Sequence, residues 1–277
     1  MKLNNKNFIL LMQSLVIILF IGLWELFSRL KIINSFLISS PSEIIMLTFE
    51  YLKNGNLLEH IQISLIETTL GLIIGTALGI ICAILLWFFP LLVKIFDPFL
   101  VMLNALPKTA IAPILIIWAG TGMKGIIVVS ISLSLAITII SGINYFINID
   151  ANKYKMMKIL NANKIQILFK LVLPSNVGNI FNIIKINIGL SWIGVIVGEF
   201  LVSRSGIGYL VIYGSQVFRM DIVMMGVLIL CLLSLIMYLV LNIIEKIFYK
   251  ITHFKPREKH TLIYSAYFNL IREINEK

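Results

Sequence analysis

The stretch TTLGLIIGTALGIICAILL, residues 68–86, decides the fold class of this chain. It is a continuous apolar run, close to the roughly 20 residues that an α-helix needs to cross a bilayer. Its glycines recur at every fourth position, Gly71, Gly75 and Gly79, and Ala83 continues the series. Small side chains at this spacing share one helical face and let a second helix approach closely. The stretch therefore predicts a membrane helix that packs either inside one subunit or at an interface between subunits.

The composition extends this prediction to most of the chain. Of 277 residues, 59% are hydrophobic and 13% are charged, and the mean hydropathy is +0.99, too apolar for a soluble domain. Apolar runs that could cross a membrane cover residues 8–27, 67–89, 99–118, 126–146, 177–200 and 222–244. The runs are continuous rather than alternating, which favours helices over barrel strands. We expect an all-α integral membrane protein with six transmembrane helices.

The basic residues predict the orientation. With the N-terminus inside, fifteen of the 23 Lys and Arg residues fall in inner segments, six fall in outer segments, and Lys108 and Lys185 fall within spans. This is the bias of the positive-inside rule, so both termini are expected to be cytoplasmic. Topology and anionic lipid explain the net charge of +10, and no nucleic-acid partner is needed.

Residues typical of an energy-coupling or catalytic site are missing from the sequence. The glycine-rich GTGMKG at 120–125 lacks the spacing of a nucleotide-binding P-loop. The three histidines have no partners at metal-ligand spacing, and we expect no metal site. Cys82 and Cys231 both lie in spans, where a disulfide framework is not expected. A transporter built on this chain would need energy and solute capture from other chains.

Polar residues inside the third and fifth spans are candidates for a translocation path. Pro107 and Pro113 predict a kink in the third span, and Lys108 lies between them with Asn104 nearby. Lys108 either lines a water-filled path that favours anions, or pairs with a free carbonyl or with Glu67 or Glu199. In the fifth span, Lys185 is expected to snorkel to the inner headgroups. Trp192 and Glu199 are the better path candidates there, although Glu199 could equally be an outer interfacial charge.

The segment 150–174 predicts two short helices and a tight turn on the inner membrane face. Asp150 is a suitable N-cap, and Tyr154 and Met157 follow at helical spacing. Asn161 is expected at the turn because asparagine tolerates the left-handed conformation. A second helix from Lys164 runs on until Pro174. Such a helix-turn-helix could dock in a groove of a partner or lie on anionic headgroups.

This segment resembles the cytoplasmic coupling loop, or EAA loop, of bacterial ABC importer permeases. In that pattern Glu-Ala-Ala and a glycine precede an Ile-x-Leu-Pro ending. Here Lys155, Met156 and Met157 stand where Glu-Ala-Ala is usual, Asn161 followed by Ala162 stands at the glycine, and Leu173 and Pro174 close the pattern. The loss of the glutamate removes a partner for basic groups on an ATPase.

Three further segments are similar, in order, to the nitrate, sulfonate, taurine and thiamine-precursor branch of these permeases. They begin at SPSEIIM (40–46), DPFLVML (97–103) and GEFLVSRSGIGYLV (198–211), and the resemblance runs from about residue 39 to 250. It implies a multi-pass bacterial cell-membrane permease that moves a small solute and is not itself an enzyme. Its implied partners are cytoplasmic ABC ATPase subunits, an extracytoplasmic solute-binding protein and a second copy of the permease. ATP-Mg is then expected on the ATPase chain, with no cofactor on this one.

The expected organisation has three parts. Residues 1–60 form an N-terminal transmembrane helix and an outer segment, 61–248 the importer transmembrane domain with five helices, and 249–277 a cytoplasmic tail. In that tail Leu262, Ala266, Leu270 and Ile274 could form an amphipathic helix, or the tail could fray. An ion-coupled secondary transporter is the alternative function. It calls for paired intramembrane carboxylates or internal repeats, and the sequence shows neither.

Overall fold

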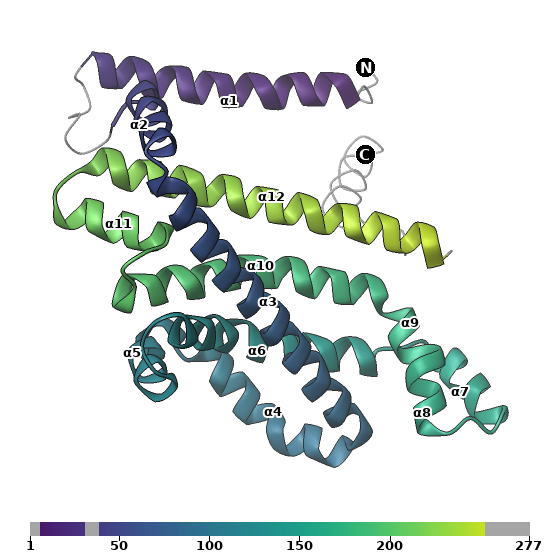
Figure 1. Cartoon of the computed structure of the whole chain (residues 1–277). Coiled ribbons are helices and arrows are strands. Elements are labelled where there is room, and N and C mark those ends of the chain that lie inside the picture. The colour runs from purple at the N-terminus through teal and green to yellow at the C-terminus, as the bar shows by residue number, and fades with distance from the viewer. Residues whose placement is uncertain (1–5, 31–38, 253–277) are drawn as a thin grey trace, which may run out of the picture.

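The computed structural model describes residues 6–30 and 39–252, which form helices joined by turns (Figure 1). Within these residues, five helices are long and apolar enough to cross a bilayer: α1 (Lys6–Arg29), α3 (Asn56–Phe88), α6 (Met123–Ile147), α10 (Val177–Val202) and α12 (Met220–Thr252). Shorter helices are α2 (Pro41–Lys53), α7 (Ala151–Ile159), α8 (Lys164–Ile167), α9 (Leu173–Ser175) and α11 (Ile207–Gln216), and a π-helical turn covers Leu168–Val172.

The predicted third span is not one kinked helix. The segment instead forms α4 (Pro90–Ala105) and α5 (Lys108–Ala119), which are bent by 98° at a break over Leu106 and Pro107. Pro107 has no backbone N–H, and its ring disfavours helical backbone at the residue before it. Leu106 accordingly takes an extended conformation with φ −62° and ψ 136°. If this pair counts as one broken span, the described residues cross the membrane six times, as predicted.

The glycine face of α3 packs against α6 within the protomer. A Cβ added to Gly79 would lie only 2.5 Å from side-chain carbons of Thr138, and one added to Gly142 would lie 2.8 Å from Ala83. The residues meet in order: Gly71 with Ser130, Gly75 with Ser134, Gly79 with Thr138 and Ala83 with Gly142. Both faces therefore repeat at every fourth residue, and of the two readings of this stripe the structure supports packing inside one subunit.

Helix α10 packs against both α3 and α6 at this seam. A Cβ added to Gly194 would lie 2.5 Å from the Ser130 Cα, so the two backbones are nearly in contact. The Asn187 amide donates hydrogen bonds of 2.8 Å to the hydroxyls of Thr76 and Thr138, and so joins α10 to both other helices. A buried polar group in a membrane protein needs such partners, and here they come from the same three helices.

Lys185 has a buried partner rather than a headgroup contact. Its Nζ lies 2.5 Å from Glu245 Oε2 of α12, and both side chains are largely buried. Tyr238, also on α12, places its ring 5.7 Å from the same ammonium group. The expectation that Lys185 snorkels to the membrane surface is therefore wrong, because a carboxylate on the neighbouring helix satisfies the charge inside the bundle.

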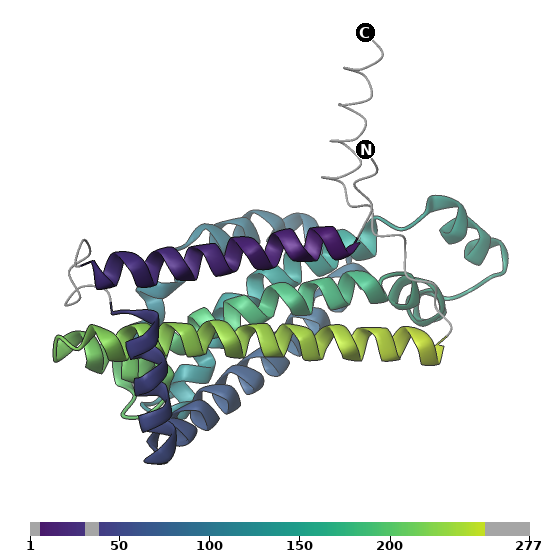
Figure 2. The same ribbon diagram turned by 90° about the horizontal axis from the view of Figure 1, so that it is seen from above.

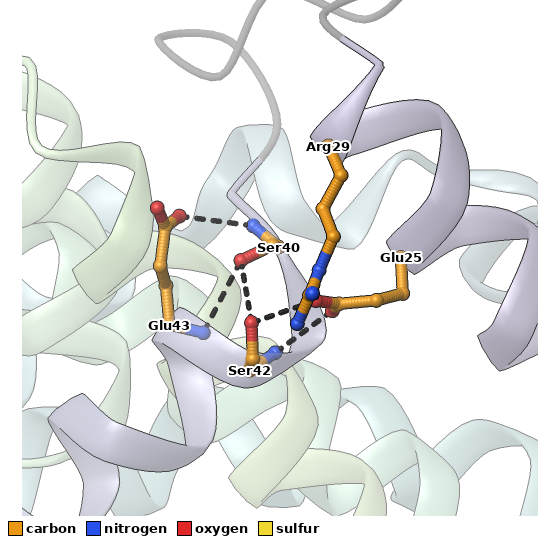
Figure 3. A network of polar contacts seen from close by, with 5 residues as sticks. All are labelled: Glu25, Arg29, Ser40, Ser42 and Glu43. Atoms are coloured by element: carbon orange, nitrogen blue, oxygen red, sulfur yellow. Dashed lines mark hydrogen bonds and ion pairs between the residues drawn. The ribbon is translucent and has the colours of Figure 1, made fainter.

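A corner of polar contacts fastens α2 to the end of α1 (Figure 3). Glu25 of α1 accepts hydrogen bonds from the backbone N–H and the hydroxyl of Ser42, at 3.1 and 2.9 Å, and Arg29 pairs with the same carboxylate at 2.7 Å. The carboxylate thus lies at the N-terminus of α2, where backbone N–H groups point outward and favour negative charge. This contact sets the angle between the two helices.

A capping box starts α2 at this corner. Ser40 accepts a hydrogen bond from the Glu43 backbone N–H, and Glu43 accepts one in return from the Ser40 backbone N–H at 3.1 Å. The Ser39 hydroxyl also donates to Glu43 at 2.9 Å. These donors, the Ser40 backbone first, hold the pKa of the Glu43 carboxyl below its usual value.

The helix ends divide between two ends of the molecule. The start of α1, the finish of α12 and the pair α7–α8 lie together at one end, and α2 and α11 lie at the other (Figures 1 and 2). This arrangement agrees with an even number of membrane crossings, counted from α1 through α12 with both included. Which end faces the cytoplasm stays a prediction from the charges. The predicted amphipathic tail helix at 262–274 lies outside the described residues.

Candidate functional site

The α7–α8 hairpin is the first candidate site, and its turn is built as the sequence predicts. Asp150 caps α7 by accepting a hydrogen bond from the Asn152 N–H at 2.9 Å. Asn161 takes the left-handed conformation, with φ 54°. Asn163 then starts α8 in a reciprocal capping box with Gln166. Both helices begin at a side-chain cap, so the hairpin is a defined structure rather than an irregular loop.

The hairpin presents exposed apolar side chains. Ile159 is 80% exposed and Met156 is 56% exposed. The same is true of three more apolar residues at and beyond the turn: Leu160, Ile165 and Phe169. Lys155 is also exposed, whereas Met157 is half-buried. The hairpin lies at the end of the spans rather than along their sides (Figure 2), so these side chains form a candidate contact surface for a partner.

The root of the hairpin is packed into the body of the protomer. Ile167 and Val172 are fully buried, and they belong to a cluster that also contains Ala83 of α3, Leu100 of α4 and Phe146 of α6. Met157, Ala162 and Leu173 pack against this cluster. Pro174 lies in the first turn of α9, directly after the π-helical turn. Three of the predicted coupling residues therefore anchor the hairpin, while Lys155 and Met156 are exposed.

The break between α4 and α5 is the second candidate site. Lys108 is the first residue of α5 and is half-buried, and its Nζ donates to the Leu133 carbonyl of α6 at 3.4 Å. Of the alternatives for this lysine, the structure shows the pairing with a backbone carbonyl. The bond is long, and more than half of an ammonium's donor capacity is left for another group. Asn104 lies on the other side of the break and is exposed.

Trp192 and Glu199 have a different setting, inside the protomer. Trp192 is 3% exposed, in a cluster with Ile207 and Leu210 of α11 and Met225 of α12. Glu199 is 1% exposed and accepts a hydrogen bond of 2.6 Å from the Ser64 hydroxyl of α3. The suggestion that Glu199 is an outer interfacial charge does not fit this burial.

Glu199 belongs to a network that satisfies the N-terminus of α11, which we call the α11 node. Gly208 and Tyr209, in the first turn of α11, donate their backbone N–H groups to Glu199 Oε2 at 2.5 and 3.4 Å. The two preceding donors have partners on α3: Gly206 N–H donates to His60 Nδ1 and Ile207 N–H to Ser64 Oγ, each at 2.8 Å. All four N–H groups that open this helix are therefore paired.

The α11 node also holds a second carboxyl group. Glu67 is 2% exposed, and its carboxyl lies beside that of Glu199. Its Oε2 has no hydrogen-bond partner among the described residues. Glu199 accepts hydrogen bonds from Ser64 and from the α11 backbone, so Glu199 is the carboxyl that holds the start of α11. The sequence did not reveal this pair, and its hydrogen bonds assign it to joining helices.

His60 and Ser64 were not predicted as site residues. His60, Ser64 and Glu67 follow one another at steps of four and three, which places them on one face of α3. That spacing of polar residues at the start of an apolar run was a usable signal. Their partners lie 135 to 146 positions away along the chain, and periodicity alone cannot identify contacts at that separation.

Comparison with known proteins gives the family. Residues 75–250 match the model described as "Binding-protein-dependent transport system inner membrane component". Among curated relatives, a protein named as an aliphatic sulfonates transport permease, SsuC, of Bacillus subtilis is 28% identical over 76% of this chain and 76% of its own length. The taurine transport system permease TauC of Escherichia coli is 21% identical over 80% and 83%. The resemblance inferred from the sequence motifs is confirmed.

A solved structure supports the fold. The fold resembles that of a chain of the MetNI methionine ABC transporter in inward-facing conformations, with a TM-score of 0.58 and 14% identity. The match covers 71% of this chain and 96% of that chain. At this identity the likeness shows the helical architecture alone.

Proposed function

This chain belongs to the family of binding-protein-dependent transport system inner membrane components, in the sulfonate, taurine and thiamine-precursor branch of ABC permeases, and we propose from that membership what each part does. It is a multi-pass inner-membrane permease subunit, and its relatives are named as transport permeases rather than enzymes. In the proposed function, two copies form the path for a small solute. ATPase chains holding ATP-Mg supply the energy, and a binding protein delivers the solute.

The exposed apolar surface of the α7–α8 hairpin carries this proposal. Burying a side chain such as Ile159 or Met156 in a partner's groove stabilises the complex by about 1.5–3 kcal/mol each. The surface is formed by two short capped helices, and an amphipathic helix in a groove is a common mode of recognition. An ATPase at the hairpin end, with apolar pockets for these residues, is the occupant that fits the family.

The buried root lets the hairpin transmit motion. Ile167 and Val172 are fully buried in the cluster that includes residues of α3, α4 and α6. Because closely packed interiors deform little, a displacement of the hairpin by a closing ATPase would move these helices as a unit. Met157 belongs to the root, so in the proposed mechanism it holds the hairpin in place while Met156 and Ile159 make the contact.

The translocation path is proposed along the break between α4 and α5. Asn104 and Lys108 flank the break and keep unused hydrogen-bonding capacity, which suits an anionic solute such as a sulfonate. Trp192 and Glu199 are proposed to act indirectly, because both are buried where they position α10, α11 and α12. The names of the relatives, which include sulfonate, taurine and formylaminopyrimidine permeases, give the small solutes to test.

The test is ATP-dependent uptake by vesicles that contain this chain together with its ATPase and binding protein. We expect accumulation of taurine or an alkanesulfonate only when ATP is present on the ATPase side. Lys108→Met should reduce uptake of an anionic solute about tenfold or more, since one charge-assisted contact is worth about 1.5–3 kcal/mol. Lys124→Met, at an exposed lysine of α6, is the matched control and should leave uptake unchanged. Uptake driven by an ion gradient without ATP would instead support the secondary-transporter alternative.

A further inference from the structure

A cavity of about 560 Å³ lies between the hairpin root and the nearby ends of α3, α4 and α6. Its wall is largely apolar, with Trp87, Phe146 and Ile149 among the lining residues. Its rim carries Lys94 of α4, Lys155 of α7 and Lys164 of α8. The cavity therefore combines an apolar interior with three ammonium groups from three separate helices.

The charges at this cavity are all of one sign. Among the described residues that line it, none is acidic. Lys164 is fixed at the rim because its Nζ donates to the Phe88 carbonyl at 3.3 Å. Three like charges gathered around one cavity repel each other unless an anion lies between them. The lining thus favours a ligand with a negatively charged group.

The position of the cavity indicates where that ligand comes from. Trp87 and Phe88, whose rings pack edge to face with centroids 5.2 Å apart, lie at the end of α3, and α4 turns back at Pro90. Aromatic residues at the end of a span mark the level of the headgroups. Next to them, Leu91 and Ile95 of α4 are exposed and apolar, as expected where acyl chains lie. The cavity is therefore at the membrane surface and next to lipid.

We propose that this cavity binds an anionic phospholipid of the adjacent leaflet. The lipid phosphate lies among Lys94, Lys155 and Lys164, and an acyl chain follows the apolar wall at Trp87 and Phe146. The bound headgroup joins α7 and α8 to the turn between α3 and α4. The hairpin is then held at its root by lipid as well as by protein packing. This site does not depend on the solute or on the ATPase.

A second cavity beside the hairpin differs from the proposed site in the charge and polarity of its lining. It measures about 380 Å³ and is lined by Lys153, but also by Asp150 and several polar residues. One lysine and one carboxylate together leave no net charge there, and the lining is too polar for an acyl chain. Lys153 therefore provides a control position on the same helix as Lys155.

The experiment is native mass spectrometry of the purified full chain in detergent. The probes are phosphatidylglycerol, phosphatidylcholine with the same acyl chains, and inorganic phosphate. We expect phosphatidylglycerol to be retained at least about tenfold more than phosphatidylcholine, since each nearby lysine contributes roughly a fivefold change in affinity. Inorganic phosphate at millimolar concentration should not displace it. Displacement by phosphate, or equal retention of the two lipids, would overturn the proposal.

Two triple variants locate the site. K94Q/K155Q/K164Q should lose the preference for phosphatidylglycerol, and K153Q/K158Q/K170Q, which removes the same charge from the same region, should keep it. Equal loss in both would show diffuse surface attraction and overturn the proposal. Because Lys164 also bonds to Phe88, K94Q/K155Q is a second variant that spares this contact, and it should reduce the preference at least about fivefold. The triple Lys→Arg variant should retain it.

Discussion

The α11 node and the α7–α8 hairpin lie at opposite ends of the molecule. The node has paired polar groups, whereas the hairpin has exposed apolar side chains. At the node, every backbone N–H that opens α11 is paired, and the partners come from α3 and α10 of the same chain. At the hairpin, Ile159 and Met156 remain exposed although apolar. The node is complete within one chain, whereas the hairpin is proposed to be completed by a partner chain. Variants inside the spans should therefore reduce stability, and variants on the hairpin surface should reduce assembly.

The largest loss of stability is expected from Lys185→Met. It leaves Glu245 buried without its partner, and breaking a buried ion pair in this way costs about 3–5 kcal/mol. The double variant Lys185→Met/Glu245→Leu removes both charges and should recover most of the loss. Thermal unfolding in detergent compares them. Equal destabilisation of the single and double variants would show that the pair is not the source of the effect.

Replacement of Glu199 should cause the next largest loss of stability. Glu199→Gln turns an acceptor of several hydrogen bonds into a group that also donates, which we expect to cost about 2–3 kcal/mol. Glu67→Gln is the matched control, because it changes the neighbouring carboxyl and removes no acceptor of an α11 backbone N–H, and it should cost less than about 1 kcal/mol. Unfolding midpoints of the two variants give the order. If Glu67→Gln is the more damaging, the hydrogen bonds of Glu199 are not what holds the start of α11.

A substitution where α10 packs closely against α6 should reduce stability by a smaller amount. A second glycine of α10 provides the matched control. Gly194→Ala places a Cβ 2.5 Å from the Ser130 backbone and should cost about 1–3 kcal/mol through overpacking. Gly189→Ala, on the same helix, meets nothing within 4 Å and should be neutral or stabilising by up to about 1 kcal/mol, since alanine favours helix. Yield and unfolding midpoint measure both. Similar behaviour of the two variants would argue against the close approach of these helices.

The smallest effect is expected at the hairpin turn. Asn161 has φ 54°, which a β-branched residue tolerates poorly, so Asn161→Val should destabilise the turn by about 1–2 kcal/mol. Asn161→Gly should be tolerated, because glycine adopts this conformation without strain. Hydrogen exchange over residues 151–166 reports the local opening. If the turn exchanges as slowly in Asn161→Val as in the unchanged protein, the left-handed conformation at residue 161 is not required for its stability.

Much of the fold could be predicted from local patterns in the sequence. The four-residue repeat of Gly71, Gly75 and Gly79 predicted close helix packing, and Asn161 predicted a left-handed turn. The partner face on α6 has the same spacing, with Ser130, Ser134 and Thr138, so the pairing of α3 with α6 was also within reach. These features depend on residues that lie near one another in the chain.

Other features depend on contacts between distant residues, and the sequence could not supply them. Proline 107 predicted a kink, but the 98° bend depends on how α5 packs against α6. Lys185 was expected to snorkel because its stem could reach the headgroups, but its partner in the structure, Glu245, lies 60 positions later. Glu199 was a candidate for the path or for an outer interfacial charge, and its hydrogen bonds to the N-terminus of α11 come from residues that the sequence did not connect with it. In each case a tertiary partner determines the role of a polar residue.

We propose that the hairpin surface docks an ATPase, and co-purification of the two chains measures this docking. A tagged chain is purified from membranes together with its ATPase and compared with the variants Ile159→Asp and Asn152→Asp. Both add one negative charge to exposed positions of α7, but only the first changes the apolar surface. The proposed function predicts that Ile159→Asp loses the ATPase while the permease itself stays folded, and that Asn152→Asp retains it. Full recovery of the ATPase with Ile159→Asp would contradict the claim.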